Sequence, residues 1–322
     1  MAITVETLQF AARDGRPLTG SLHIPPVSNR RAVLINSALG TPRARYDAFA
    51  RFLAEAGFSV LSYDNRGIGG SRTAVGDADR VRLRQWGEAD LPAALDCLAA
   101  RLPEARQFAV GHATGGRLLG LAPNLGQLSG IVTIAAGTAY RGDARGLAGI
   151  RLALAGYVTV PLAGRLLSRV PGRLLLGAEA DVPAGIARDW ARGCRQAGGD
   201  LDAAGPASRA GFEAYRGPLL AYAIEDDPLA PRRPSVRCTG NSSMPRSSRA
   251  GSPRIRGTPR SARRVISATT IAACGPRWPV GWPPAESTGR GLPALPGASG
   301  TGAGPRDAVT VVGPAVNRVR LR

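Results

Sequence analysis

The chain of 322 residues contains no lysine, and all 42 of its basic residues are arginine. Alanine, glycine and proline are abundant, and we interpret this bias as that of a GC-rich coding sequence rather than as a selected arginine surface. Histidine is almost as scarce, because only His23 and His112 occur. No histidine therefore follows residue 112.

Other scarce features exclude whole classes of site. The four cysteines have no C-x-x-C spacing, so neither a zinc site nor a disulfide framework is indicated. Residues 67–70 are rich in glycine but lack the Lys-Ser/Thr of a phosphate loop. The sequence thus predicts no cofactor and no metal. Residues 1–18 lack the basic and apolar parts of a signal sequence, which predicts a cytoplasmic protein.

Charge is distributed unevenly along the chain. Residues 1–228 carry a net charge of +5, whereas residues 229–322 carry +14. The second segment also holds 13 of the 26 prolines and has no apolar period of 3.6 or two residues. Such a segment buries too little apolar surface to offset its ordering entropy, so we expect low order there.

Three interpretations of residues 232–322 stay open. A basic arm for nucleic acid would interleave arginines with stacking aromatics, but Trp278 and Trp282 are the only aromatics here. An inert tail is the second interpretation. We favour the third, an altered reading frame that begins just after Pro231, since a shifted frame in a GC-rich gene yields Arg, Pro, Ser, Gly and Ala without a hydrophobic period. No nucleic-acid partner is expected on this interpretation.

Residues 1–231 alternate between strand and helix patterns. Apolar strands are predicted at 32–35, 58–63, 107–110, 130–134 and 219–224, and helices at 46–57, 88–102 and 116–121. The strand at 219–224 is the last one predicted. Continuous apolar strands flanked by helices are buried on both faces, so they belong to one mostly parallel sheet. The pattern predicts a single α/β domain.

A long excursion, residues 139–212, separates the last two predicted strands. It is too long for a structureless loop, so we expect it to form helices. An insertion here lies above the carboxyl ends of the strands, where α/β sheets bind ligands. Its most apolar piece, 152–164, is about 13 residues long and interrupted by Pro161, whereas a membrane span needs about 20. We interpret the excursion as a lid that shapes a pocket, with ordinary packing helices as the alternative, and we expect no membrane span.

Residues 111–115 are Gly-His-Ala-Thr-Gly, placed between a predicted strand and a predicted helix. This is the context of a nucleophile elbow, G-x-S-x-G, with alanine in place of serine. Glycines flank the central residue because it is held at a strained backbone angle with its side chain projecting from the sheet. A methyl group cannot attack a carbonyl, so Ala113 leaves the scaffold without its nucleophile.

Three motifs resemble the α/β-hydrolase superfamily, and within it the bacterial serine hydrolases related to monoacylglycerol lipases and serine aminopeptidases. Residues 63–72 are close to the pattern Y-D-x-R-G-x-G-x-S, residues 111–116 match the elbow, and residues 224–231 are similar to the loop that carries the catalytic acid. Residues 181–183 together with 189–192 are also similar to the lid of one branch. The likeness covers residues 1–231 and implies an α/β-hydrolase fold with a helical lid, acting on a small ester or amide.

The resemblance assigns the triad residue by residue. Its nucleophile position holds Ala113. Its acid position falls on Asp227, with Asp226 as second choice and a solvated loop of turn-forming carboxylates as the alternative. Its histidine should follow that acid, yet none does. His112 precedes the nucleophile position and is interpreted as a packing histidine, and His23 as a structural one.

The oxyanion site is implied by the same resemblance and consists of backbone amides. One amide is that of Thr114, and the other comes from the loop 36–40, with Ala38 the best candidate. The Thr114 hydroxyl is not expected to replace the serine, because it begins the helix and has no base. Ser37 and Ser71 are interpreted as turn residues. The sequence therefore predicts a catalytically impaired relative of serine hydrolases, with a non-catalytic binder of a small ester-like or amide-like ligand as the alternative and an arginine-tailed nucleic-acid binder less favoured.

Overall fold

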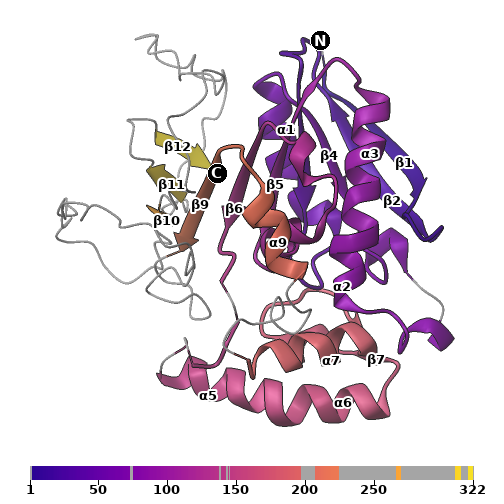
Figure 1. The fold of residues 1–322 in the computed structure, drawn as a ribbon, viewed down its shortest axis with the longest axis vertical. Coiled ribbons are helices and arrows are strands. Elements are labelled where there is room, and N and C mark those ends of the chain that lie inside the picture. Colours follow the sequence, from indigo (N-terminus) through magenta and orange to yellow (C-terminus); the bar gives the residue numbers. More distant parts are fainter. Residues whose placement is uncertain are drawn as a thin grey trace, which may run out of the picture.

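The computed structural model describes residues 2–72, 75–137, 139–142, 144, 146–196 and 207–224, together with three short later strands. The strands are β1 (Thr4–Ala11), β2 (Pro17–Ile24), β3 (Arg31–Asn36), β4 (Ser59–Tyr63), β5 (Arg106–His112), β6 (Gly130–Ile134), β7 (Arg169–Val170), β8 (Val182–Pro183), β9 (Leu219–Ile224), β10 (Ile266–Thr269), β11 (Val309–Val312) and β12 (Arg318–Leu321). All except the β7–β8 pair join one sheet in the order β1-β2-β4-β3-β5-β6-β9-β10-β11-β12. Figure 1 shows this sheet with helices around it.

The centre of the sheet is parallel. β3 pairs in parallel with β4 and β5, β5 with β6, and β6 with β9. β1 and β2 form an antiparallel hairpin, whose second strand runs antiparallel to β4. The mostly parallel α/β fold predicted from the sequence is confirmed, and β6 and β9 have the predicted bounds.

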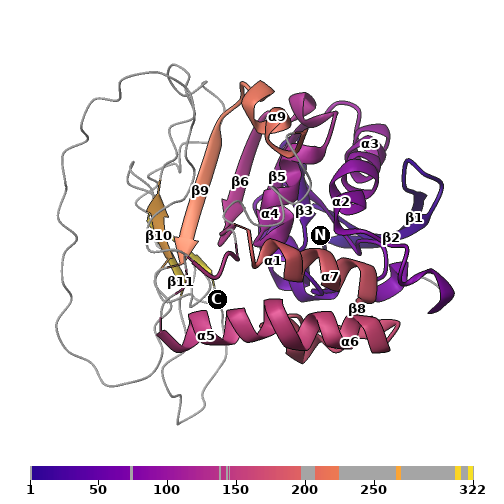
Figure 2. The same cartoon turned by 60° about the horizontal axis from the view of Figure 1, so that its bottom comes forward.

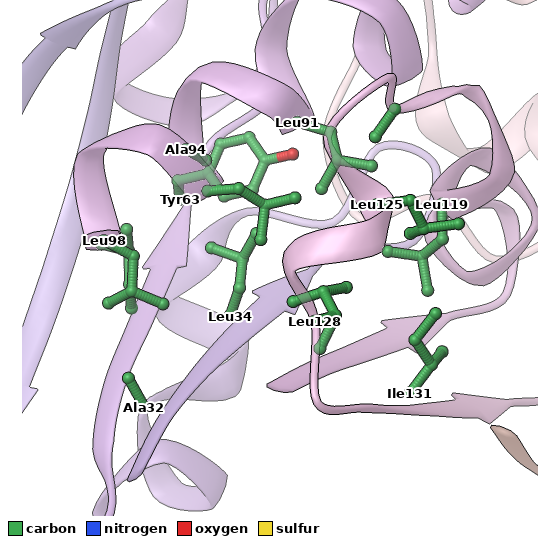
Figure 3. Close-up of a cluster of buried hydrophobic side chains, with 14 of the residues drawn as sticks. Ala32, Leu34, Tyr63, Leu91, Ala94, Leu98, Leu119, Leu125, Leu128 and Ile131 are labelled. Carbon is green, nitrogen blue, oxygen red and sulfur yellow. The ribbon is translucent and has the colours of Figure 1, made fainter. Parts of the chain in front are cut away.

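Helical segments cover both faces of the sheet. Before the insertion they are η1 (Arg43–Tyr46), α1 (Asp47–Glu55), η2 (Gly69–Ser71), η3 (Val75–Asp77), α2 (Leu83–Gln85), the π-helix η4 (Trp86–Asp90), α3 (Leu91–Arg101), α4 (Thr114–Leu118), η5 (Leu119–Leu121) and η6 (Leu125–Gln127). Side chains alternate along a strand, so β3 faces two cores. Leu34 packs with Leu91 and Leu98 of α3 (Figure 3), whereas Ile35 packs with Ala50 of α1.

The long excursion between β6 and β9 forms its own helices, as expected. It contains α5 (Gly146–Leu154), the π-helix η7 (Ala155–Thr159), α6 (Val160–Leu166), η8 (Gly172–Leu175), α7 (Ala184–Gly193) and α9 (Ala207–Ala214), with the β7–β8 pair between them. Figures 1 and 2 show α5, α6 and α7 layered beyond the ends of β6 and β9 that carry their arrowheads, while α9 lies beside the sheet. The insertion therefore lies at the carboxyl ends of the strands.

The helix that contains the apolar piece 152–164 is longer than that piece and is not interrupted within it. α5, η7 and α6 follow one another without a break, so the helix runs over 21 residues, Gly146–Leu166. Pro161 does not interrupt it, because the amide of Val160 donates to Ala155 in the wider π-turn that precedes the proline. By length and composition this helix is able to cross a membrane. In its most apolar stretch of 18 residues, 28% is buried against the rest of the structure.

The sheet also extends beyond the last predicted strand. β10 pairs antiparallel with β9, β11 pairs parallel with β10, and β12 pairs antiparallel with β11. The prediction missed these strands because each has four residues, too few to show an alternating pattern against a background of Arg, Gly and Pro. The loop 225–231 and the remainder of 232–322 lie outside the described residues, so the low order expected there stays a prediction.

Candidate active site

The elbow, residues 111–116, has the backbone shape of a nucleophile turn. β5 ends at His112 and α4 begins at Thr114, with Ala113 between them at φ 48° and ψ −117°. A positive φ is strained for a residue with a Cβ atom and persists only where the surrounding structure imposes it. The chain therefore keeps the strained turn at a position where its side chain is a methyl group.

Close packing explains the glycines around Ala113. A Cβ atom on Gly111 would overlap the backbone of Gly116, and one on Gly115 would overlap the carbonyl oxygens of Asn36 and Ser37. Neither neighbour is a flexible side chain that could move aside. The sequence of the elbow is thus dictated by contacts between α4 and the ends of β3 and β5.

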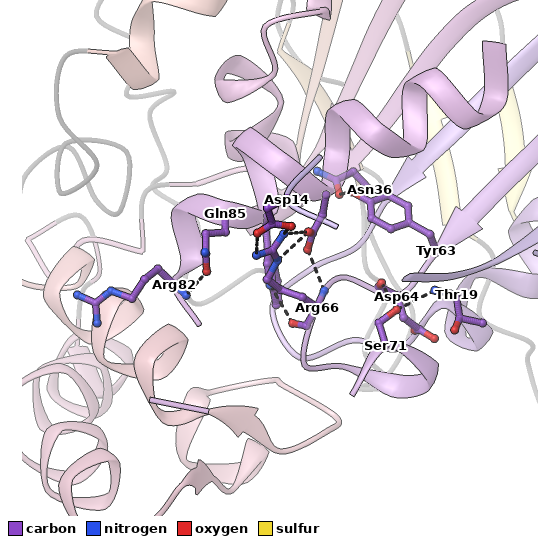
Figure 4. A network of polar contacts seen from close by, with 11 residues as sticks. Asp14, Thr19, Asn36, Tyr63, Asp64, Arg66, Ser71, Arg82 and Gln85 are labelled. Atoms are coloured by element: carbon purple, nitrogen blue, oxygen red, sulfur yellow. Dashed lines mark hydrogen bonds and ion pairs between the residues drawn. The ribbon is translucent and has the colours of Figure 1, made fainter. Parts of the chain in front are cut away.

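Asn36 joins three elements at this point. Its Nδ2 donates to the carbonyl oxygen of Gly115 at 2.8 Å, and its Oδ1 accepts from the Tyr63 hydroxyl at 2.8 Å. Both side chains are buried, and burial raises the pKa of Tyr63 well above its ordinary value. The amide of Asn36 therefore holds the loop 36–40 against the elbow; Figure 4 shows Asn36 next to Tyr63.

The two backbone amides predicted for the oxyanion site differ in their hydrogen bonding. Thr114 is the first residue of α4, so its N–H has no acceptor inside the helix. The N–H of Ala38 donates instead to the Tyr46 hydroxyl at 2.9 Å, and that hydroxyl lies 2.9 Å from Nδ1 of His112. Ala38 can donate to a ligand oxygen only when the Tyr46 hydroxyl moves away.

Tyr46 is the residue that sequence reasoning missed. It was placed in the predicted helix 46–57, whereas it ends η1 and turns its hydroxyl toward the elbow. Burial raises its pKa to about 12, so the hydroxyl is protonated over the physiological range. Nothing in the spacing around residue 46 distinguishes it from an ordinary helix residue, since the contact with His112 joins residues 66 positions apart.

The hydroxyl groups near the elbow are engaged in structural contacts. Thr114 Oγ1 accepts from Nη2 of Arg117 at 3.0 Å. Ser37 donates to the carbonyl oxygen of Tyr63 at 3.3 Å, and Ser71 donates to that of Asp64 at 2.7 Å. All three side chains are buried. Ser71 lies in η2, whereas Ser37 directly follows β3.

The 63–72 loop is a second well-ordered turn, fixed by ion pairs. Arg66 is fully buried, and its Nε donates to Asp90 at 2.7 Å. Its two terminal nitrogens contact Asp14 at 2.6 and 2.8 Å (Figure 4). Asp64 accepts from the amides of Arg43 at 2.7 Å and Gly70 at 2.9 Å, and from the Arg43 guanidinium. Arg66 and Asp64 are thus paired with other groups of the protein, so we assign the loop a structural role.

The two histidines lie in different parts of the sheet. His112 ends β5 and directs its Nδ1 at the Tyr46 hydroxyl. His23 lies on β2, which is separated from β5 by β4 and β3 in the sheet. It is completely buried, its Nε2 lies 4.0 Å from Asp47, and burial lowers its pKa. The positions predicted for the acid, Asp227 and Asp226, lie outside the described residues.

No metal centre is evident in the part of the chain that the structure describes, where no three His, Cys, Asp or Glu side chains gather in a suitable group. A family model described as serine aminopeptidase, S33, matches residues 27–242, which is more than half of the chain. The chain belongs to the serine aminopeptidase (S33) family. The match includes the loop 36–40, the 63–72 loop, the elbow and the insertion, and it leaves residues 1–26 and 243–322 outside.

Solved structures of α/β hydrolases are similar to this S33 family chain at low identity. An α/β serine hydrolase of Xanthomonas campestris, described as lacking a lid, is 20% identical, with 43% of this chain and 64% of that chain covered and a TM-score of 0.36. A carboxyl esterase of Bacillus coagulans is 18% identical, with 48% and 51% covered and a TM-score of 0.37. An α/β hydrolase of Penicillium is 20% identical, with 57% and 62% covered and a TM-score of 0.38. The chain thus spans half to two thirds of the length of these structures, and a search of curated proteins gives no match.

Proposed function

We propose that this S33 family chain has lost the hydrolytic step of its relatives and keeps the ligand-binding scaffold for a small ester-like or amide-like molecule. One observation carries the proposal: the elbow is built in full around Ala113, whose side chain has no atom able to attack a carbonyl. Acyl transfer through this elbow needs a hydroxyl or thiol with a base in reach. Position 113 carries no hydroxyl or thiol, the Thr114 hydroxyl accepts from Arg117, and Nδ1 of His112 is directed at Tyr46.

The first experiment asks whether any residue of the elbow is reactive. The purified chain is treated with a fluorophosphonate probe and assayed with p-nitrophenyl acetate, and we expect neither labelling nor hydrolysis above the uncatalysed rate. Peptide mass mapping identifies any modified residue. Phosphonylation within residues 111–116 would overturn the proposal, since it would reveal a nucleophile that the structure does not place there.

The variant Ala113→Ser tests whether the base is the second missing part. Serine fits this backbone as alanine does, but without a base it is a weak nucleophile, so we expect no restored turnover. The matched control is Ala113→Cys, whose thiol is intrinsically more nucleophilic and should react slowly with iodoacetamide. Saturable ester hydrolysis by Ala113→Ser would show that a base lies in reach of residue 113.

The ligand-binding part of the proposal depends on the two predicted amides, of which that of Thr114 has no acceptor inside α4. Tyr46→Phe removes the hydroxyl from Ala38 and leaves that amide open to a ligand oxygen. We expect this variant to bind short-chain carboxylates more tightly than the original chain in isothermal titration. Tyr157→Phe, on the insertion, is the matched control and should leave binding unchanged.

We further propose that the insertion acts as a lid over this site. Leu118 and Leu121, which directly follow the elbow, lie in one buried cluster with Leu152, Val160 and Trp190 of the insertion. The insertion therefore packs on the same segment that presents Ala113. A lid in this position excludes water from the site and determines which ligands fit.

A further inference from the structure

The long helix of the insertion carries an apolar face that the rest of the described structure leaves exposed. Its six most exposed large apolar side chains, between 52% and 73% accessible, form the outer stripe: Leu147, Ile150, Leu154, Val158, Leu162 and Leu166. Their spacing of three or four residues keeps them on one side of the helix. Single exposed apolar side chains need no explanation, but a continuous stripe marks an interaction surface.

The opposite face of the same helix is fixed to the protein. Leu152, Ala155 and Val160 are almost completely buried and pack with Ile186 and Trp190 of α7. The helix therefore has apolar side chains on two opposite sides, and one of these sides packs against α7. Crossing a membrane would tear this packed side from α7, whereas lying on a surface would leave it intact.

The surroundings of the outer stripe are cationic. Arg151 and Arg165 lie exposed on the helix itself, and the sequence has no acidic residue between Asp143 and Glu179. Two further exposed guanidinium groups, those of Arg141 and Arg195, lie 5.6 and 5.7 Å from the ring centre of Tyr157. An open hollow of about 480 Å³ next to them is lined by Arg141, Ile150, Ala153, Leu154, Tyr157 and Val158.

We propose that the outer stripe docks this chain in the plane of an anionic lipid surface. A helix of 21 residues is about 30 Å long, and an interfacial helix buries its apolar face about 5–10 Å into the headgroup boundary. The stripe supplies the buried apolar area. The arginines lie at the level of the lipid phosphates, and each basic side chain near an anionic leaflet adds attraction that salt screens.

The charges also argue against a second copy of the chain as the occupant. A symmetric dimer through the outer stripe would bring the same patch of each copy together. Arg151 and Arg165 would then face the same arginines of the other copy, and the described helix has no acidic side chain to compensate them. An anionic surface pairs with these side chains instead.

Vesicle sedimentation with the full-length chain tests the proposal. Vesicles of phosphatidylcholine alone are compared with vesicles in which about one third of the lipid is phosphatidylglycerol, a strongly anionic surface. We expect binding to the anionic vesicles that weakens as salt is added. The double variant Leu154→Gln/Leu162→Gln removes two stripe side chains without adding charge, and it should bind at least about tenfold more weakly.

Two controls separate the apolar and the charged contributions. Phe52→Gln changes an apolar side chain that is also exposed, but lies on α1, and should leave vesicle binding unchanged. Arg151→Gln/Arg165→Gln should reduce the preference for anionic vesicles while keeping the fold, as judged by circular dichroism. Equal binding to both vesicle types would overturn the role of charge.

Failure of the original chain to bind anionic vesicles would overturn the docking proposal itself. Light scattering on the same samples identifies the alternative occupant. A dimer that the Leu154→Gln/Leu162→Gln variant converts to monomer would assign the stripe to a second copy. Because vesicle binding is measured without any ester substrate, its failure is distinct from failure of the proposed loss of hydrolysis.

Discussion

The elbow and the 63–72 loop both follow parallel strands of the same sheet, yet they are held in shape by opposite means. The elbow requires glycine at positions 111 and 115, because Cβ atoms there would overlap the backbone. The 63–72 loop depends on ion pairs, with the buried Arg66 between Asp14 and the buried Asp90. Neither mechanism involves the side chain of residue 113. The shape of the turn therefore does not depend on which side chain occupies position 113.

Breaking the charges of the 63–72 loop should have the largest effect. Arg66→Met leaves Asp90 buried without its partner, which costs about 3–5 kcal/mol of unfolding free energy. Arg84→Met is the control, because the Arg84–Glu88 pair is about half exposed and its loss should change stability by no more than about 0.5 kcal/mol. Urea denaturation measures both. Equal losses would show that burial of the Arg66 pair is not what stabilises the loop.

Filling the close contact in the elbow should come next. Gly115→Ala places a methyl group on the carbonyl oxygens of Asn36 and Ser37, so we expect a loss of about 3 kcal/mol from overpacking. Gly126→Ala, in η6, meets no atom within 4 Å and should be close to neutral. Thermal unfolding compares the two. A tolerated Gly115→Ala would mean that α4 can move away from the end of β3.

Relieving the strain at the elbow should give a smaller effect of opposite sign. Ala113→Gly removes the Cβ atom that makes φ 48° unfavourable. Glycine also raises the entropy of the unfolded chain, which offsets part of this gain, so we expect a net stabilisation of about 1 kcal/mol. Ala109→Gly, in the buried interior of β5, should instead destabilise by about 1 kcal/mol. A destabilised Ala113→Gly would contradict the strained geometry.

Acid should weaken the 63–72 loop through Asp14, with the smallest effect. Hydrogen bonding to Arg66 lowers the pKa of Asp14, so its carboxylate stabilises the folded state above its ordinary pKa of about 3.9. That contribution is lost as the pH falls through the lower folded value. The side chain is 40% exposed, so the loss is small. The stability difference between the original chain and Asp14→Asn should therefore be constant near neutral pH and vanish in acid, as measured by urea denaturation against pH.

Much of the fold follows from short-range patterns in the sequence. β6 and β9 were predicted residue for residue, because continuous apolar strands between turns have few alternative structures. The backbone of the elbow was equally predictable from its glycines. The contact of Tyr46 with Ala38 and His112 was not, since it depends on how η1 packs against β5.

Prolines explain the largest error in the helices. One residue separates each of Pro92 and Pro161 from the end of a π-helix. The amide of that residue, Leu91 or Val160, donates to the carbonyl oxygen five residues earlier. The extra residue gives the proline ring room where an α-helix would clash. A proline in an apolar run was taken as an interruption of the helix, whereas here it accompanies a bulge inside a continuous one.

The Tyr46 hydroxyl already accepts a hydrogen bond from the Ala38 amide, so a ligand oxygen can bind this amide only by displacing the hydroxyl. An incoming oxygen must replace an acceptor that is already in place, and a neutral ester carbonyl would trade one neutral hydrogen bond for another. A carboxylate forms a charge-assisted bond of roughly twice the strength, so it gains from the same exchange. The Tyr46 hydroxyl thus favours acids over neutral esters as partners of the Ala38 amide.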